Sequence, residues 1–586
     1  MKDTSDTNIM QIQLWLNNWT QALGSSDIDA LKRLWITDSH WRDVLGLHWN
    51  LQTTSGCVEI SETLIRRALV INPRKWSVRT GPLGIQKTQR AGRDVIECIL
   101  DFETDVGPCE AVLRLVVDAA ENGTLKAWSL MTALVEIKGH EEKFKNKRHK
   151  SNMVGRSFIG PNWLERREES IRFDDRDPAV LVVGSGQAGL SVAARLSQLG
   201  IDTLVIDKNE RVGDNWRKRY NALVLHNQSF VNHLPYLPFP DTWPTYIPKD
   251  MLAGWFEYYA QAMELNVWCE STFTGGHYDS VKGSWEVSVL QGDKVRCLRP
   301  RHLILCTGVS SIPNRSPIDD LDVFQGPIIH SADYKGAHSW VGKSVVVMGT
   351  GTSAHDVAQD LCENGAQVTM IQRSPTMVQN VEPTAQLPYV LYDQGLPVSH
   401  CDLVSLGTPM EVYKENNRIA NRLALSLDRD TLEGLEIAQF TLNKGEDGIG
   451  WQMMYLTRGG GYYFNVGCSD LIIQKRIKVI QLKDVTHFME DGFQLNNGSH
   501  IKAELIITAK GYLGQNSMVE QFFGIEMAKK IGPVWGIDPI SQELCNMWKP
   551  TPQVGLWFHA GSFAQCRINS KYLALQIKAR ELGMLC

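Results

Sequence analysis

Three glycines and one acid between residues 178 and 207 have the types and spacing needed to hold a dinucleotide. Gly184, Gly186 and Gly189 form a G-x-G-x-x-G pattern between a short β-branched run and a helical segment. The first glycine permits a tight turn, the second lets the backbone approach a pyrophosphate, and the third lets helix and strand pack closely. Asp207 ends the next apolar run, about 18 residues later, where an acid accepts hydrogen bonds from a ribose. The predicted cofactor contacts here are Gly184, Gly186, Gln187, Gly189, Asp207 and Lys208.

A second glycine loop begins at Gly349, after the apolar run 344–348. Its next strand ends in Gln372-Arg373-Ser374, with no carboxylate. An acid there would repel a 2′-phosphate, whereas arginine binds it through forked, charged hydrogen bonds. The second loop is therefore predicted to hold NADPH, and the first FAD. The predicted contacts of the second loop are Gly349, Gly351, Ser353, Ala354 and Arg373.

The segment between the two loops carries a more specific pattern. Phe324, Gly326, His330 and Tyr334 spell F-x-G-x-x-x-H-x-x-x-Y. This resembles the identifying sequence of flavin-containing monooxygenases. The related Baeyer–Villiger signature ends in Trp-Pro, where this chain has Tyr334-Lys335, which favours the flavin-containing and N-hydroxylating branch. The resemblance implies that His330 serves domain communication and cofactor geometry; without it, His330 is equally a hydrogen-bonded linker residue.

Three further segments extend the resemblance to class B flavin monooxygenases over residues 178–586. Gly213, Trp216 and Arg217 resemble a G-G-x-W-R segment that lies along FAD. Thr307-Gly308 resembles the A-T-G turn that joins the two nucleotide domains. Ala509–Tyr512, which contains Gly511, resembles the A-T-G-Y turn that closes the FAD domain, with Lys510 in place of threonine.

The resemblance implies a reaction carried by the flavin. NADPH reduces FAD, O₂ forms a C4a-(hydro)peroxyflavin, and one oxygen atom passes to a small organic substrate. The protein supplies orientation and a shielded pocket. We expect His226 and Asn227, in the proline-rich loop 225–240, to lie near the flavin with His330; alternatively, they only satisfy the loop backbone.

The substrate and even the oxygenation step stay open at this stage. The chain also resembles the plant auxin-forming YUCCA enzymes, which implies an α-keto acid such as indole-3-pyruvate. Baeyer–Villiger oxygenation of a ketone and an NADPH oxidase that releases H₂O₂ are alternatives. A further rival is a nucleotide-binding interaction protein whose N-terminal part is functional.

The pattern predicts an α/β fold with two Rossmann-like domains, for FAD and NADPH, preceded by a small α+β unit. Helical patterns come first in residues 8–68, and alternating runs follow to residue 137, an order that resembles the cone-shaped nuclear-transport-factor-like fold. We expect this unit to fold independently. The predicted divisions are 1–150 for the α+β unit, 151–177 for a linker, 178–340 and 486–586 for the two parts of the FAD domain, and 341–485 for the NADPH domain with an insertion.

Composition narrows the partners. The 586 residues carry a net charge of −5, so neither nucleic acid nor an anionic membrane is an expected partner. The N-terminus lacks a signal-peptide plan, and no apolar run is long enough to span a bilayer, which predicts a cytoplasmic location. No two of the 12 cysteines form a C-x-x-C pair, so neither a metal site nor a dithiol is expected. The oligomeric state is not predicted.

Overall fold

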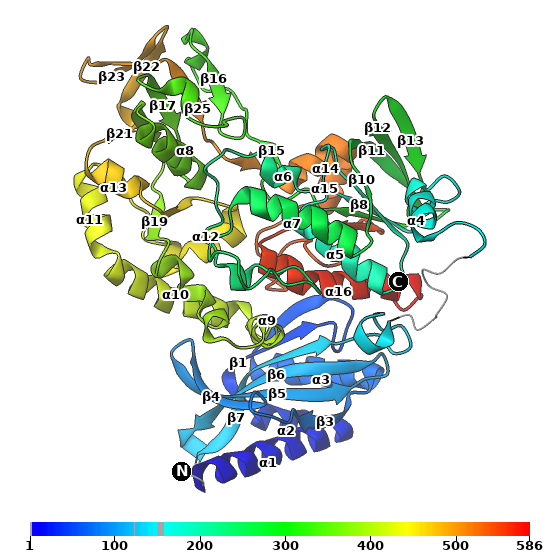
Figure 1. The fold of residues 1–586 in the computed structure, drawn as a ribbon. Helices are drawn as coiled ribbons and strands as arrows, with labels where there is room; N and C mark the ends of the chain where they lie inside the picture. The colour runs from blue at the N-terminus through cyan, green and yellow to red at the C-terminus, as the bar shows by residue number, and fades with distance from the viewer. Residues whose placement is uncertain (1–2, 122, 149–157, 586) are drawn as a thin grey trace.

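An N-terminal unit of three helices and a seven-stranded sheet opens the chain, at the bottom of Figure 1. This computed structural model describes residues 3–121, 123–148 and 158–585, so residues 151–157 of the predicted linker lie outside the described part. The strand order is β2-β1-β7-β6-β5-β3, with β4 beside β5. The elements are α1 (Asp3–Ser25), α2 (Ile28–Arg33), β1 (Trp35–Val44), β2 (Leu51–Ser55), α3 (Cys57–Ile71), β3 (Arg74–Val78), β4 (Ile85–Arg90), β5 (Arg93–Glu103), β6 (Pro108–Asp118) and β7 (Thr124–Leu134).

A five-stranded parallel sheet forms the centre of the first nucleotide unit, in the order β10-β9-β8-β14-β27. Helix α5 follows β8, and α16 packs against α5, although the last residue of α5 and the first residue of α16 are 365 positions apart in sequence. All four residues of β8 are buried, as expected for a parallel strand covered on both faces. The elements are β8 (Val180–Val183), α5 (Gln187–Gln198), β9 (Thr203–Ile206), α7 (Lys249–Ala262), β10 (Asn266–Trp268), β14 (His302–Leu305), β27 (Leu556–Phe558) and α16 (Phe563–Glu581).

A second five-stranded parallel sheet has the order β16-β25-β17-β18-β21. Strand β25 lies in the middle of this second sheet, although its residues fall in the range predicted for the second part of the FAD domain. Strand β16 joins the same sheet from within the range predicted for the first part of that domain. Short, mostly apolar strands carry no signal that says which of two similar sheets they enter. The elements are β16 (Ile328–His330), β17 (Ser344–Met348), α8 (Thr352–Glu363), β18 (Gln367–Gln372), β21 (Ile477–Gln481) and β25 (Leu505–Thr508).

A largely helical insertion separates β18 from β21 and lies between the second unit and the N-terminal unit in Figure 1. Its elements are β19 (Met377–Asn380), α9 (Val398–Leu406), α10 (Met410–Leu427), α11 (Arg429–Ile437), α12 (Trp451–Arg458), β20 (Tyr462–Asn465) and α13 (Cys468–Ile473). The remaining elements flank the two sheets: α4 (Trp163–Arg172), α6 (Asp214–Arg217), β11 (Ser271–Asp279), β12 (Ser284–Gln291), β13 (Lys294–Leu298), β15 (Ile312–Pro313), β22 (Val485–Met489), β23 (Gly492–Leu495), β24 (His500–Lys502), β26 (Tyr512–Leu513), α14 (Gln515–Phe523) and α15 (Ile525–Ile531).

The N-terminal unit is docked tightly on the rest of the molecule. Arg114 is fully buried, pairs with Glu97 at 2.8 Å, and donates hydrogen bonds to the backbone carbonyls of Val404 in α9 and of Gly407 directly after it. One hydrophobic cluster runs from the N-terminal strands through α9 and α16 to α5. Independent folding of this unit stays a prediction, but the shared core shows that its removal would expose apolar surface.

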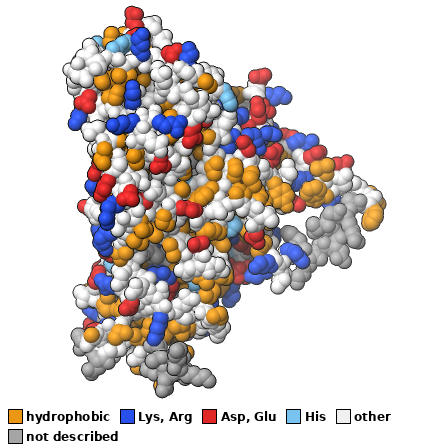
Figure 2. Space-filling view, turned by 60° about the vertical axis from the view of Figure 1, so that its left-hand side comes forward, with side chains coloured by type: hydrophobic (Ala, Val, Ile, Leu, Met, Phe, Trp, Pro, Cys, Tyr) orange, Lys and Arg blue, Asp and Glu red, His pale blue; other side chains and the backbone are white. Residues whose placement is uncertain are grey.

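Charged side chains of both signs are interspersed over the face shown in Figure 2. No helix in the described part of the chain is long and apolar enough to cross a membrane.

Candidate active site between two glycine loops

The first glycine loop has the geometry that its sequence predicts. Gly184 adopts φ +109°, a conformation that side chains rarely permit. A Cβ on Gly189 would lie 1.8 Å from the carbonyl oxygen of Gly184, so only glycine allows this approach of helix to strand. Gly186 stands at the N-terminus of α5, where no side chain caps the helix. The first N–H groups of α5 are therefore open to an anion such as a pyrophosphate.

The second loop repeats this geometry. Gly349 has φ +124°, and Gly351 precedes α8 with dihedral angles of −81° and −177°, close to the −76° and −173° of Gly186. The start of α8 also lacks a side-chain cap. A Cβ on Gly351 would meet nothing within 4 Å, which leaves room for a diphosphate. Both loops therefore fit a dinucleotide.

The two strand ends differ in charge. Asp207 is buried, and its carboxylate accepts hydrogen bonds from the N–H and hydroxyl of Ser185 and from the N–H and amide of Asn209, at 2.7–2.9 Å. The ribose contact predicted for Asp207 would have to be shared with these four donors. Arg373 is exposed, and the described residues give it no hydrogen bond or ion pair. It is free to meet a phosphate.

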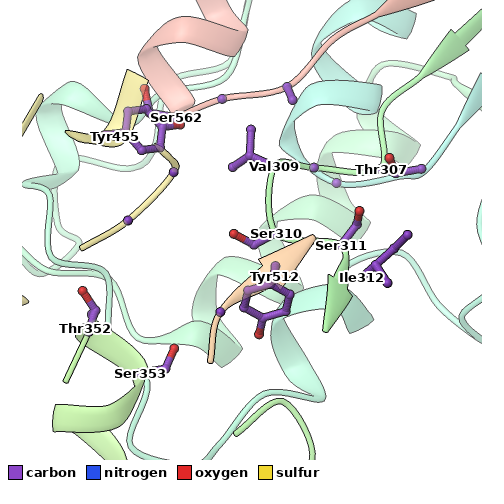
Figure 3. Close-up of a pocket in the computed structure, with 18 of the residues that line it drawn as sticks. Thr307, Val309, Ser310, Ser311, Ile312, Thr352, Ser353, Tyr455, Tyr512 and Ser562 are labelled. Carbon is purple, nitrogen blue, oxygen red and sulfur yellow. The ribbon is translucent and has the colours of Figure 1, made fainter. Parts of the chain in front are cut away.

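One cavity of about 1680 Å³ contains both loops. Figure 3 shows Thr352 and Ser353 at the start of α8, Tyr455 beside Ser562, and the segment from Thr307 to Ile312 passing through the same view. The structure brings most of the predicted site residues to its wall. These are Gly184, Gly186, Gln187, Asp207, Lys208, Trp216, His226, Asn227, Gly308, Gly349, Gly351, Ser353, Ala354, Arg373 and Gly511.

The other predicted site residues do not line this cavity. Besides Gly189, they are Gly213, Arg217, Phe324, Gly326, His330 and Tyr334. Tyr334 is buried, and its hydroxyl donates to Asp360 on α8 at 2.5 Å. His330 accepts the N–H of Ala332 through Nδ1 at 3.1 Å, and its Nε2 has no partner among the described residues. It lines a separate, smaller pocket with Lys510. The positions of His330 in β16 and of Tyr334 beside α8 suit support of the second unit's sheet and helix.

His226 and Asn227 face the cavity from the proline-rich loop. Burial lowers the pKa of His226 to about 4, so its ring is neutral at physiological pH. The ring lies edge-on to Phe464, with the centroids 4.9 Å apart. The side-chain amide of Asn227 donates to the hydroxyl of Tyr389 at 3.3 Å, and its Oδ1 has no partner among the described residues. Both side chains are therefore more than backbone ties of the loop.

The insertion adds an aromatic wall that no sequence motif marks. Tyr389, Tyr413, Trp451, Tyr455 and Tyr462 line the cavity. The residue after Tyr462, Tyr463, is instead fully buried, with its ring stacked on that of His355 at a centroid distance of 3.9 Å. Such a wall is hard to detect from sequence, because a helix whose apolar face lines a cavity has the same pattern as one that lines a core.

Three contacts place this wall between the two loops. Thr352, in the second loop, donates to the carbonyl of Tyr462 at 3.1 Å. Tyr455 is hydrogen-bonded to Gln565 at 3.3 Å, in the first turn of α16. Gln187, in the first loop, donates at 3.3 Å to the carbonyl of Gly561, just before α16. The aromatic side chains thus face the space where the reactive ends of two loop-bound dinucleotides would meet.

Comparison with known proteins identifies the family. Residues 177–392 match the model of the flavin-binding monooxygenase-like family. The chain is 31% identical over 338 residues to the probable indole-3-pyruvate monooxygenase YUCCA3 of Arabidopsis thaliana, covering 57% of this chain and 72% of that protein. It is 29% identical to the indole-3-pyruvate monooxygenase YUCCA1 of Oryza sativa subsp. japonica, over 59% of this chain and 78% of the relative.

The protein therefore belongs to the flavin-binding monooxygenase-like family, and it is an FAD- and NADPH-dependent monooxygenase. Among solved structures, cyclohexanone monooxygenase bound to ε-caprolactone has the same fold, with a TM-score of 0.51 and 16% identity over 69% of this chain and 88% of that one. The structure of OTEMO with FAD and NADP gives a TM-score of 0.52 at 15% identity, covering 70% and 86%. The family model does not reach the N-terminal unit.

Proposed function

We propose that the first glycine loop holds FAD, the second holds NADPH, and the aromatic wall receives a small organic molecule that is oxygenated between them. The observation that carries this proposal is the single cavity lined by both loops and by the insertion. The curated relatives are named for indole-3-pyruvate, so similarity alone suggests an α-keto acid. Fold and family do not fix the substrate.

The chemistry is that of the bound cofactors, and the chain positions them. FAD, when bound, accepts a hydride from NADPH and activates O₂. One oxygen atom enters the substrate and the other leaves as water, with electrons from NADPH and one further proton from solvent. The uncapped starts of α5 and α8 bind the two diphosphates. Trp451, Tyr455 and Tyr462 exclude water from the reacting region.

His226 and Asn227 orient the reacting groups in this proposal. The neutral His226 ring lies at the cavity, and the side-chain amide of Asn227 fixes the hydroxyl of Tyr389 in the same wall. His330 acts from outside the cavity, as a positioning residue of the second sheet. We expect Asn227→Ala to raise the fraction of NADPH oxidised without product, while FAD binding remains.

The test is a purified full chain with one equivalent of FAD, assayed for NADPH oxidation, product and H₂O₂ together. A substrate is expected to shift the electrons from H₂O₂ to an oxygenated product. If every compound in a broad screen leaves the H₂O₂ yield equal to NADPH consumed, the protein is an NADPH oxidase. A protein that binds no FAD would contradict the proposal altogether.

For the N-terminal unit we propose a nuclear-transport-factor-like cone. The order of three helices and a strongly paired sheet supports this. Two polar side chains of this unit are occupied within it: Asp43 accepts the hydroxyl of Thr132 at 2.7 Å, and Trp41 donates to the same hydroxyl oxygen at 3.0 Å. The Nδ1 atom of His48 lies 3.7 Å from Asp43 and has no hydrogen bond among the described residues. A cytoplasmic location remains a prediction from sequence.

A further inference from the structure

The part of the cavity beside the aromatic wall has a distinctive charge balance. We call this part the aromatic chamber; its wall consists of Arg42, His226, Asn227, Tyr389, Leu406, Met410, Tyr413, Trp451, Tyr455, Tyr462, Gln542, Glu543 and Asn569. Several of its polar atoms are buried and have no partner among the described residues. They are Nε1 of Trp451, Oδ1 of Asn227, Oε1 of Gln542 and Oδ1 of Asn569. All four belong to neutral groups and have almost no accessible surface, so none of them offers a charge to a ligand.

Arg42 is the one arginine or lysine among the described residues of the chamber wall, and its charge is already matched. Its Nε and one terminal nitrogen donate to the two carboxylate oxygens of Glu543, each at 2.7 Å. Its other terminal nitrogen donates to the carbonyl of Leu406 at 2.8 Å. Thr53 adds a hydrogen bond to the same carboxylate at 3.3 Å. A carboxylate entering the chamber would therefore meet Glu543 instead of a free cation.

The remaining cations on the cavity wall lie toward the nucleotide loops. Lys208 follows β9, Arg373 follows β18, and Lys510 follows β25. Three further cations on the cavity wall are Lys218, Arg219 and Lys335. Lys335 donates to the carbonyl of Lys218, and Arg219 precedes Tyr220, whose hydroxyl donates to Asp356 on α8. These six positions suit phosphates, which leaves the chamber without a cation for a substrate.

We propose that the substrate of this enzyme is an uncharged aromatic molecule, and not a carboxylate such as an α-keto acid. The aromatic side chains of the chamber provide the apolar surface that receives it. A buried carboxylate without a paired cation is strongly disfavoured. This inference rests on the proposed function, since it assigns the substrate class of the same site, and it departs from the substrate named for the relatives.

The first experiment compares matched ligands on the FAD-loaded full chain. The ligands are three aryl-pyruvates of increasing size, phenylpyruvate, indole-3-pyruvate and naphthylpyruvate, each with its methyl ester, and binding is measured by calorimetry. We expect at least one ester to bind about tenfold or more tightly than its acid. An acid that binds as well as its ester, or a failure of all esters to bind, would overturn the inference. FAD content and reduction by NADPH, measured in the same sample, report separately on the proposed function.

A second experiment changes the charge balance of the chamber. Glu543→Gln leaves Arg42 with an unmatched charge. For the aryl-pyruvate whose ester binds, we expect the affinity of the free acid to rise about tenfold and the affinity of the ester to change less than about twofold. The matched control is Glu142→Gln. This change weakens an ion pair between Glu142 and Arg195, which are 3.2 Å apart and do not line the cavity. The control is expected to change neither affinity. If Glu543→Gln retains FAD but leaves the acid unimproved, Arg42 does not face the ligand and the inference fails.

Discussion

The two glycine loops are built alike but prepared for different ligands. Residues of the second unit correspond to those of the first at a spacing of 165: Gly349 to Gly184, Gly351 to Gly186 and the last residue of each central strand, Met348 to Val183. The N–H of each first glycine donates to the end of the neighbouring strand, at 2.8 Å in the first unit and 2.9 Å in the second. In the proposed function, this common backbone provides the diphosphate site in both units.

The side chains at corresponding positions are where the units diverge. Asp207 corresponds to Gln372, which is buried and bonded to Thr441, and Lys208 corresponds to Arg373. On the other side of the loop, Thr307 before Gly308 corresponds to Lys510 before Gly511, two glycines with φ of +85° and +81°. The first unit thus has an acid, a lysine and a hydroxyl where the second has a neutral amide, an arginine and a lysine. In the proposed function, the common backbone shape provides a dinucleotide site in both units, and the charge at the strand end selects the dinucleotide.

The largest expected effect concerns the third position of each loop. Gly189→Ala places a Cβ 1.8 Å from a backbone oxygen, which we expect to cost about 3 kcal/mol or more and to reduce copurified FAD below about a tenth of an equivalent. The reverse change in the second loop, Ala354→Gly, should cost only about 0.5–1 kcal/mol. FAD content and urea midpoints measure both. If the two substitutions lowered the urea midpoint by the same amount, the third position would be packed equally tightly in both loops.

The second expected effect is on NADPH. Arg373→Ala removes a charge-assisted hydrogen bond to the 2′-phosphate, about 1.5–3 kcal/mol, which corresponds to a rise in KM of about 10–150-fold. NADH, which lacks this phosphate, should be nearly unaffected. The matched control is Lys208→Ala, the corresponding change in the first unit, which should leave the NADPH-to-NADH preference unchanged. If Arg373→Ala weakens both nucleotides alike, Arg373 supports the domain surface instead.

A third difference is sensitivity to pH. The second helix carries His355 and Asp356 where the first has Leu190 and Ser191. Burial lowers the pKa of His355 from 6.5 to about 4, so the unfolded state takes up its proton first and acidification from pH 7 to 5 destabilises the fold by about 2 kcal/mol. Burial raises the pKa of Asp356 from 3.8 to about 6, so the folded state takes up that proton first and gains about 1 kcal/mol.

Exchanging these residues for their counterparts separates the two contributions. Relative to the unaltered chain, His355→Leu should lose about 2 kcal/mol less stability between pH 7 and 5. Asp356→Ser should lose about 1 kcal/mol more over the same interval. Urea unfolding at pH 5, 6 and 7 measures both. Parallel pH profiles for the two variants would mean that neither group titrates in this window.

The smallest expected effect is that of Lys510, which is partly exposed and bonded to Ser316. Lys510→Thr restores the residue found at the corresponding position of the first unit. Because a partly exposed charge contributes about 0.2–1 kcal/mol, KM for NADPH should rise by up to about fivefold, with no change for NADH. A rise as large as that of Arg373→Ala would assign Lys510 the principal phosphate contact.

Local patterns predicted the local structures well. The loop at Gly184–Gly189 depends on neighbouring residues alone, and its turn, helix and strand lie where the glycine spacing puts them. The strand end at Asp207 was placed correctly, yet its four hydrogen bonds come from side chains and backbone that the sequence does not orient. Prediction succeeded where a glycine's backbone freedom decides the structure.

Long-range contacts explain what the sequence did not reveal. Trp451 and Tyr389 meet in the chamber through an insertion with no motif, and their rings lie 6.2 Å apart only after the chain has folded. Glu543 is 501 residues from its partner Arg42. Strand β25 could not be assigned to its sheet for the same reason. Cavity walls are assembled from residues whose individual patterns match those of an ordinary core.

The docking of the N-terminal unit sets an order on biosynthesis. The carbonyls that accept from Arg114 are translated 290 and 293 residues after it, and Glu543 is translated 501 residues after Arg42. At about 5–20 residues per second, the ribosome needs roughly 25–100 s to bridge that last interval. Throughout this time the nascent unit displays uncovered apolar surface, and the guanidinium of Arg42 lacks its carboxylate partner Glu543. A unit that is translated early is therefore completed late, and its uncovered surface is accessible to chaperones and proteases while the rest is translated.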